Sequence, residues 1–182
     1  HGFTQPESIL DEWNLDGEDV FARRPTPEGA SHAAAVLCQM QRHAVDAAHY
    51  YDAQPSMPYC GIFTPNTLRP TPTFYPFRYW NRLYSLSGRA ETSVDGADTY
   101  AEAASDGTRR AVLIAHHAPR DEELELHVPA CAGMRYTLRG VDAAHTDAPL
   151  AHGLVYPEFP RIRWIAVGRS AFLLEFEPAS DK

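Results

Sequence analysis

The sequence predicts an α/β segment followed by an all-β segment. Through residues 1–86, short apolar runs typical of buried strands alternate with segments that have helical spacing of apolar residues. From Ser87 onward, apolar and polar residues alternate with the period of two that is typical of strands. The chain of 182 residues is 44% hydrophobic and 11% aromatic, which is ample for a packed core. We therefore expect two units, residues 1–86 and 87–182, the second of them an antiparallel β-sandwich.

The first unit is expected to begin with a strand, a helix and a second strand. The first strand lies at residues 9–14, and a polar loop with glycine and proline follows it. Thr26-Pro27-Glu28 has the composition of a helix start, because threonine can cap the first turn and proline is tolerated at its first position. We expect this helix to end near His43. The apolar run at 45–51 then predicts a buried strand, and strand, helix and strand form a parallel crossover.

A proline-rich segment at residues 54–70 separates this crossover from a second helix. It contains four prolines, and a stretch of this length without regular structure is usually functional. Thr71-Pro72 predicts the start of the second helix. The apolar stripe expected along that helix consists of Phe77, Trp80, Leu83 and Tyr84.

The second unit carries the pattern of an antiparallel fold. Asp106-Gly107 is a hairpin signal between strands expected at 99–105 and 110–116. Alternating apolar residues predict further strands, to about six in all. These lie around residues 123–128, 136–138, 162–167 and 172–176.

Charge and composition exclude several classes of function. The net charge is −8 and no cluster of Lys or Arg occurs, which argues against a nucleic-acid partner. No run of about 18 apolar residues predicts a membrane span. Cys38, Cys60 and Cys131 are widely spaced and indicate neither a disulfide framework nor a zinc site, so we expect no metal and no cofactor. The start, His1-Gly2-Phe3, resembles a cut end, which leaves the cellular location open.

Functional side chains are expected where the parallel strands end, because the following loops converge at that edge. Successive strand residues face opposite sides, so we expect only one of Asp11 and Glu12 to point toward a site there. The candidates at the first strand end are Asp11, Glu12, Trp13 and Asn14, and those at the second are Tyr50, Tyr51, Asp52 and Gln54.

Residues 1–86 resemble the final two βα units of a clan A glycoside hydrolase, a (β/α)8 barrel enzyme, and are most similar to the β-xylosidase-type family 39. The tail resembles the small β-sandwich that follows the barrel in such enzymes. Three blocks in fixed order carry the resemblance. They are Leu10-Asp11-Glu12-Trp13-Asn14, then residues 47–55 with 60–63, then residues 69–75 leading into Phe77 and Trp80.

The resemblance implies a retaining mechanism with Glu12 as the nucleophile of a covalent glycosyl-enzyme intermediate. Tyr51, Asp52 and Gln54 would contact sugar hydroxyls. In that clan the acid/base residue follows an asparagine at the end of the fourth strand, and no such strand precedes Glu12 in this chain. We therefore expect a fragment whose partners are a glycoside or oligosaccharide substrate and the missing part of the barrel.

Several of these residues have a second possible role. Trp13 either lines the sugar site or packs inside the barrel. Asn14 either orients Glu12 or caps the following turn. Asp52 is equally well explained as a structural residue.

Two other functions remain open from the sequence. The chain could be a non-catalytic module whose sandwich binds a polysaccharide or docks a barrel, or it could belong to a degenerate barrel without activity. A carbohydrate-binding face needs exposed aromatic side chains, for which only Tyr156 and Trp164 are candidates. We expect Trp164 to pack in the core.

Overall fold

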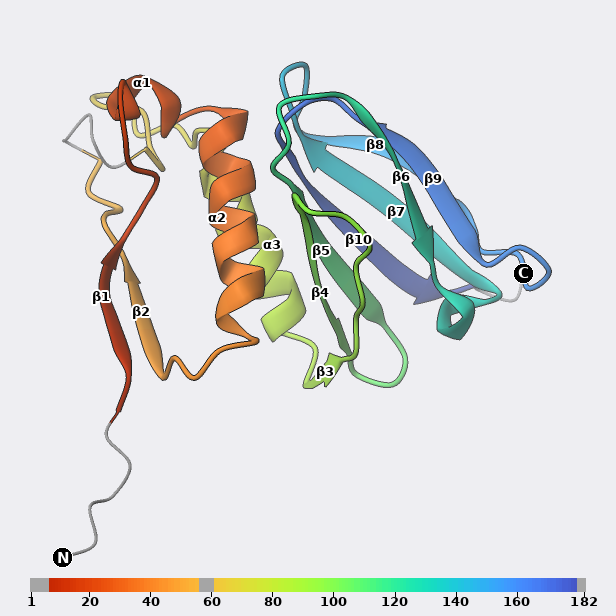
Figure 1. Cartoon of the computed structure of the whole chain (residues 1–182). Coiled ribbons are helices and arrows are strands. Elements are labelled where there is room, and N and C mark those ends of the chain that lie inside the picture. Colours follow the sequence, from red (N-terminus) through yellow and green to blue (C-terminus); the bar gives the residue numbers. More distant parts are fainter. Residues whose placement is uncertain (1–6, 56–60, 180–182) are drawn as a thin grey trace, which may run out of the picture.

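The computed structural model describes residues 7–55 and 61–179, which form three layers (Figure 1). A parallel two-stranded sheet forms the first layer, two helices the second and antiparallel strands the third. Residues 56–60, including Cys60 and part of the proline-rich segment, lie outside the described parts. The first two layers contain β1 (Ile9–Trp13), α1 (Val20–Arg23), α2 (Pro27–Met40), β2 (Ala47–Tyr50) and α3 (Phe74–Tyr84).

Helix α2 begins where the sequence predicts and ends at Met40, a few residues before the expected position. The Thr26 hydroxyl accepts a hydrogen bond from the Glu28 amide at 3.2 Å, which caps the first turn. Ala30 and Ala34 are fully buried, so the helix lies close to its neighbours. The short strand β2 follows and pairs in parallel with β1, as expected for a crossover.

The first turn of α2 is packed so tightly that Gly29 has no room for a side chain. A Cβ atom added at Gly29 would lie 2.0 Å from the carbonyl oxygen of Arg24 and 2.6 Å from Oγ1 of Thr73. The Thr73 hydroxyl itself donates to that same Arg24 carbonyl. The contact therefore joins the loop before α2 to the loop before α3, and the Arg24 carbonyl, a backbone group, cannot rotate away from an added side chain.

We expect Gly29→Ala to lower the free energy of unfolding by about 1 to 3 kcal/mol. Alanine is about 1 kcal/mol better than glycine inside a helix, so a loss of stability would isolate the steric clash. Urea unfolding followed by circular dichroism measures the difference. Asn81→Ala on the exposed face of α3 is the control and should change stability little. An alanine variant as stable as the parent chain would contradict the packing described.

Helix α3 buries a different stripe from the one predicted. Pro76, Tyr79 and Leu83 are buried, and only Leu83 belongs to the predicted stripe. Tyr84, which was predicted to lie on that stripe, is 82% exposed. Pro76 lies in the first turn of the helix, where backbone N–H groups have no partner within the helix, so its missing amide N–H removes no hydrogen bond. The buried apolar face can therefore include this proline. The remaining predicted positions, Phe77 and Trp80, are half-buried.

The third layer contains more strands than the sequence predicts. Six of them form one antiparallel sheet in the order β3-β4-β5-β10-β7-β8, and β6 and β9 form a separate antiparallel pair. Their bounds are β3 (Gly88–Ala90), β4 (Thr99–Ser105), β5 (Arg110–His116), β6 (Glu122–His127), β7 (Met134–Val141), β8 (Thr146–Leu154), β9 (Arg161–Ala166) and β10 (Ser170–Pro178). A single 3₁₀ turn, Pro129–Cys131, lies between β6 and β7.

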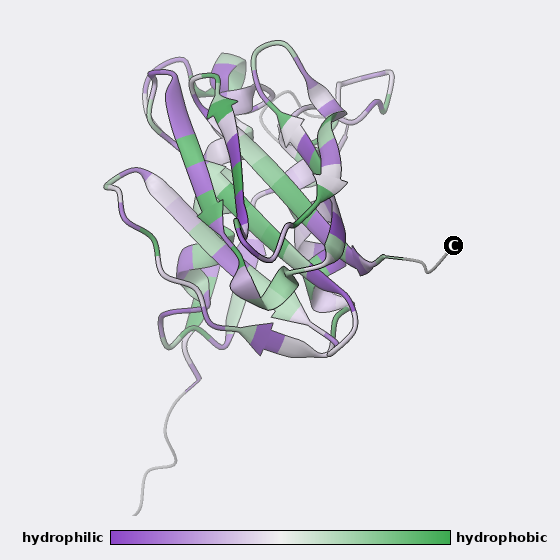
Figure 2. Cartoon of the chain, turned by 90° about the vertical axis from the view of Figure 1, so that its right-hand side faces the viewer, coloured by the Kyte–Doolittle hydropathy of each residue, from purple (hydrophilic) through white to green (hydrophobic). Residues whose placement is uncertain are grey.

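The six-stranded sheet is covered on both faces. Leu113 and Leu173 pack against α2 and α3 on one face. Phe172 and Phe176 pack against the β6–β9 pair on the other, where the ring of Trp164 meets Phe172 at 5.5 Å. Figure 2 looks onto this second face and shows the hydrophobic strands of the large sheet behind the outer pair. The sheet therefore lies between helices and strands, and one hydrophobic core spans the α3–β3 junction where the predicted boundary falls.

Strand β8 was not predicted because Pro149 and Gly153 interrupt the strand-like pattern of its sequence. The structure places β8 at the edge of the sheet, where a proline removes no ladder hydrogen bond that the sheet needs. Gly153 is required for another reason, since a Cβ there would lie 2.9 Å from the ring of Tyr136.

Two further observations complete the fold. Within the described residues, no helix is long and apolar enough to cross a membrane. The described cysteines, Cys38 and Cys131, are both buried free thiols, and burial raises the pKa of each.

Candidate functional site

The candidate site lies at the carboxyl end of β1, where the pairing with β2 is irregular. β1 contains one residue more than β2 between Leu10 and Trp13, so Asp11 and Glu12 together face the single residue His49. This arrangement is a β-bulge, which commonly re-aims a side chain next to a site. The strict alternation expected from the sequence therefore does not hold here.

The bulge leaves both carboxylates on exposed positions. Leu10 lines a hollow against α2 and the ring of Trp13 meets that of Phe77 on α3, so both of these residues face the helices. Asp11 and Glu12 lie between them and are exposed. Oδ1 of Asp11 lies 4.0 Å from Nδ1 of His49 across the strand pair. The carboxylate of Glu12 makes no hydrogen bond or ion pair within residues 7–55 and 61–179.

The ring of Trp13 packs against two aromatic rings of neighbouring elements. Its ring meets Tyr50 edge-on at 5.0 Å and Phe77 at 6.0 Å. The indole nitrogen is buried and finds no acceptor among the described residues. Buried indole N–H groups usually have a partner, and the indole nitrogen of Trp164 in the antiparallel layer likewise finds none among the described residues.

Asn14 joins the ends of the two strands. Its Nδ2 donates to the backbone carbonyl of Tyr51 at 2.6 Å, and its Oδ1 accepts from the Leu15 amide at 2.7 Å. The Tyr51 amide in turn donates to the carbonyl of Trp13 at 3.0 Å. These contacts agree with the capping role suggested for Asn14, and they hold the start of the loop after β2 beside the bulge.

The loop after β2 carries the remaining predicted residues. Tyr51 is 42% exposed, and the peptide bond between Tyr51 and Asp52 is cis. Oδ1 of Asp52 accepts from the Gln54 amide at 3.1 Å, which closes a turn and agrees with the structural role considered for Asp52. The predicted site residues thus lie at the carboxyl end of β1 and in the loop after β2, and Glu12, Tyr51 and Gln54 are among the exposed ones.

A histidine pair lies behind this edge, between α2 and the antiparallel sheet. The rings of His32 and His117 are 5.9 Å apart, and Nδ1 of His117 lies 2.8 Å from the hydroxyl of Ser31. Burial is the main cause that lowers the pKa of each histidine below its usual value. Repulsion by His117 lowers the pKa of His32 further, and the charge of Arg169 lowers the pKa of His117. The negative charge of Glu28 raises the pKa of both histidines and so acts against these effects.

This pair is expected to make stability depend on pH. The pKa of an unfolded histidine is about 6.5, and in the folded chain the pKa of each of these two histidines is lower. Below about pH 6.5 the unfolded chain therefore binds protons that the folded chain does not, so the free energy of unfolding falls as pH falls. Above that pH both states are neutral at these histidines, and the free energy of unfolding is not affected by them. We therefore expect the urea midpoint to fall between about pH 7 and about pH 5. The double variant His32→Gln and His117→Gln should show a flatter profile, and an unchanged slope would contradict the assignment.

Sequence reasoning missed one set of polar residues altogether. Glu102 was counted only as part of a predicted strand, yet its side chain is 3% exposed and forms an ion pair with Arg89. It lies beside Trp80 and Tyr84, which were predicted only as core positions. The available signal was a single carboxylate inside the otherwise uncharged run TYAEAAS.

Comparison by sequence gives no relative, since no family model and no curated protein matches the chain. Comparison by structure gives clear matches. A monomeric β-xylosidase from Caulobacter crescentus CB15 matches with a TM-score of 0.71 at 16% identity, over 96% of this chain and 46% of that one. The fold is shared with glycoside hydrolases.

Two more structures extend this likeness to other families. A family 30 endoxylanase from Clostridium papyrosolvens C71 matches with a TM-score of 0.70 at 11% identity, over 94% of this chain and 42% of that one. A family 44 xyloglucanase from Paenibacillus polymyxa matches with a TM-score of 0.66 at 9% identity, over 95% and 32%. The chain therefore spans less than half of these glycoside hydrolases, and the likeness is one of fold and not of a particular family.

Proposed function

We propose that this chain is the C-terminal part of a retaining glycoside hydrolase, with Glu12 as its nucleophile. The observation that carries the proposal is the position of Glu12. It is an exposed carboxylate in a bulge at the carboxyl end of a parallel strand, beside the loop that follows the neighbouring strand. Active sites of parallel βα barrels lie at that edge, and the fold is one that glycoside hydrolases contain.

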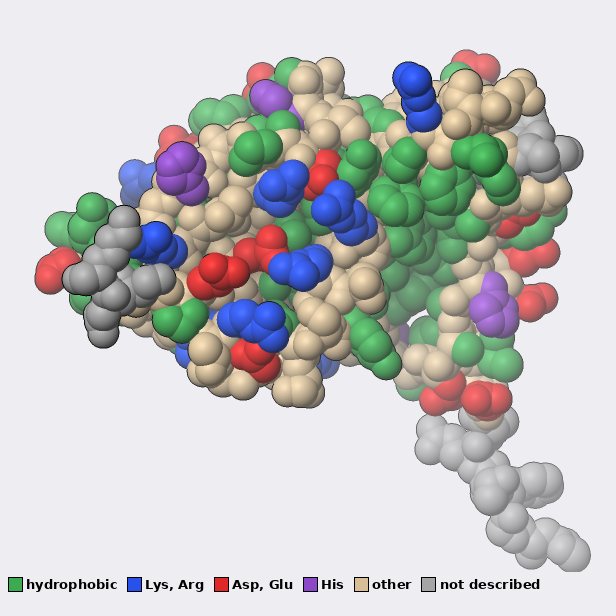
Figure 3. Space-filling model, turned by 180° about the vertical axis from the view of Figure 1, so that it is seen from behind, with side chains coloured by type: hydrophobic (Ala, Val, Ile, Leu, Met, Phe, Trp, Pro, Cys, Tyr) green, Lys and Arg blue, Asp and Glu red, His purple; other side chains and the backbone are tan. Residues whose placement is uncertain are grey.

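The β1–β2 layer supports the idea that further barrel strands belong beside it. A two-stranded sheet is marginal alone, and here Ile9 and Leu10 are 51% and 40% exposed on a strand of the first layer. Figure 3 shows hydrophobic side chains gathered beside this layer on the back of the molecule. Additional strands and helices would cover these groups.

In the proposed reaction the Glu12 carboxylate attacks the anomeric carbon of the bound sugar. The bond to the leaving oxygen breaks as an acid residue from the missing part of the barrel gives that oxygen a proton, and a glycosyl ester forms on Glu12. Water, deprotonated by the same residue, then attacks the anomeric carbon and frees Glu12. The two carboxyl groups of such a pair lie about 5 to 5.5 Å apart. Tyr51 and Gln54 would contact the sugar hydroxyls.

A second candidate function is that of a non-catalytic glycan-binding module. The observation in its favour is a pair of exposed aromatic side chains in the loop between β8 and β9, where Tyr156 is 61% and Phe159 is 75% exposed. Trp164 does not contribute to that surface, because its ring packs on Phe172 as expected. Two aromatic rings form only a small binding surface, so the evidence for a glycan-binding module is weaker than the evidence for a glycoside hydrolase.

The stereochemistry of hydrolysis tests the proposal. The full-length protein is mixed with aryl glycosides of both anomeric configurations, and proton NMR records the first free sugar before it mutarotates. Retention of configuration in that sugar is the expected result for a covalent intermediate. An inverted product would reject the retaining mechanism, and absence of hydrolysis together with glycan binding would favour the module.

A further inference from the structure

A second hollow lies far from the Glu12 edge, at the junction of the helices with the antiparallel sheet. Its volume is about 230 Å³, and it is lined by the ends of α2 and α3 and by β3 and β4. Pockets for drug-sized ligands measure about 300 to 1,000 Å³, so this one has room for a single ring-sized group. Junctions between structural units are a common place for ligand pockets.

The carboxylate in this hollow is unusual for its position. Glu102 lies on the helix-facing side of β4, where its neighbour Ala104 belongs to the hydrophobic core. Its side chain is 3% exposed, and Arg89 donates to both of its oxygens, at 2.5 and 3.2 Å. A carboxylate has about four acceptor positions, so this pair leaves acceptor capacity unused. An apolar side chain would satisfy packing at lower cost, which indicates a role beyond the fold.

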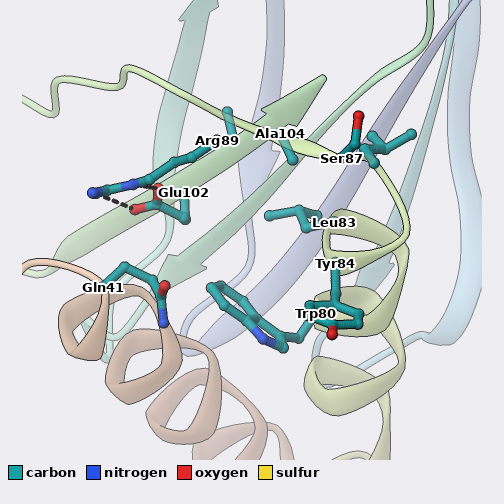
Figure 4. A pocket seen from close by; sticks show the side chains of 10 residues that line it. Gln41, Trp80, Leu83, Tyr84, Ser87, Arg89, Glu102 and Ala104 are labelled. Carbon is teal, nitrogen blue, oxygen red and sulfur yellow. Dashed lines mark hydrogen bonds and ion pairs between the residues drawn. The ribbon is translucent and has the colours of Figure 1, made fainter. Parts of the chain in front are cut away.

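Aromatic and amide groups complete the hollow. Trp80 is half-buried, whereas Tyr84 is 82% exposed and so adds little to the core. Figure 4 shows the Arg89–Glu102 pair above the ring of Trp80, with the side chain of Gln41, the C-cap residue of α2, beside them. The hollow therefore offers flat apolar faces next to planar groups that donate and accept hydrogen bonds.

We propose that this hollow is a secondary binding site for one neutral sugar residue of a glycan. The apolar face of a sugar ring would stack on Trp80 and Tyr84, and its hydroxyls would bond to the Glu102 carboxylate and the Gln41 amide. The charges of Arg89 and Glu102 cancel, so the site favours an uncharged, hydroxyl-rich ligand over a phosphate or a carboxylate. Such a site would hold a glycan at a distance from the catalytic edge.

An NMR titration of this chain tests the proposal with xylose, glucose and their β-1,4-linked trisaccharides as probes. The chain has three tryptophans, so the indole N–H of Trp80 is one of three signals and is identified with Trp80→Phe. We expect a saturable shift of that signal with a Kd of about 1 mM or weaker, which corresponds to a binding free energy of about −4.1 kcal/mol or less negative. Glucuronate, the anionic probe, should bind more weakly than glucose.

Variants decide where the sugar binds. Tyr84→Ala and Glu102→Gln should each raise Kd about tenfold. Tyr156→Ala is the control for the other exposed aromatic surface and should leave Kd unchanged, as should Glu12→Gln. Absence of a Trp80 shift with every probe would overturn the proposal, and so would a Kd that responds to Tyr156→Ala but not to Tyr84→Ala. The titration does not depend on hydrolysis, so failure of the catalytic proposal and failure of this one are distinguishable.

Discussion

Replacing Glu12 by glutamine is expected to lower kcat/KM of the full-length protein on aryl glycosides by about 10³-fold or more. Glutamine keeps the size of the side chain but cannot form the glycosyl ester. The loss should fall on kcat, because Glu12 interacts with the anomeric carbon in the transition state and contributes little to ground-state binding. Steady-state kinetics of the purified variant measure both parameters.

The neighbouring carboxylate is the matched control. Asp11 occupies the same bulge and is also exposed, but its side chain lies near His49. Asp11→Asn should therefore keep most of the activity. A small anion such as azide should restore turnover to Glu12→Ala and give a glycosyl azide of inverted configuration. Equal losses for Asp11→Asn and Glu12→Gln would contradict the assignment of roles.

Replacing Asp147 by alanine is expected to lower the free energy of unfolding of this chain by about 3 kcal/mol. The Asp147 carboxylate is 9% exposed and accepts hydrogen bonds from three side chains that hold α3 to β7. Burial and the adjacent Asp147 charge raise the pKa of the Tyr79 hydroxyl, so that group remains a donor. The donors are Arg78 at 2.8 Å, the Tyr79 hydroxyl at 3.0 Å and Arg139 at 2.9 Å.

Two companion variants separate the causes of this loss. Asp147 has a φ of 53°, a backbone conformation that asparagine tolerates better than alanine, so Asp147→Asn removes mainly the charge. Tyr79→Phe removes one hydrogen bond and should cost about 1 kcal/mol. Asp95→Ala on an exposed loop should have almost no effect. Urea unfolding measures all four, and an Asp147→Ala variant as stable as Asp95→Ala would contradict the structural role.

The parts of the fold predicted correctly have strong local signals. The cap at Thr26 and the hairpin at Asp106-Gly107 appear where short-range chemistry places them. Strand β8 was missed because Pro149 argues against a strand, and only the order of strands shows that it lies at an edge. The predicted buried face of α3 was wrong because the buried face depends on which side of the helix packs against the sheet. The burial of Tyr79 shows which side this is.

The candidate site was predictable by location but not by geometry. Strand ends in a parallel crossover indicated the edge that holds Glu12 and Asp52, whereas the bulge beside Glu12 depends on the register with β2. The pair of Arg89 and Glu102 joins β3 to β4 beside the ends of α2 and α3, and no periodicity predicts such a contact. Sequence patterns therefore found the strand ends, and tertiary packing decided which side chains meet.

Covalent trapping is the most direct test of the account. The full-length protein is treated with an activated 2-deoxy-2-fluoro glycoside, which forms the glycosyl ester but hydrolyses slowly, and the labelled peptide is identified by mass spectrometry. The account predicts one sugar per protein, attached to the side chain of Glu12. A label on Asp11, Asp52 or any other carboxylate, or turnover without a covalent adduct, would contradict it.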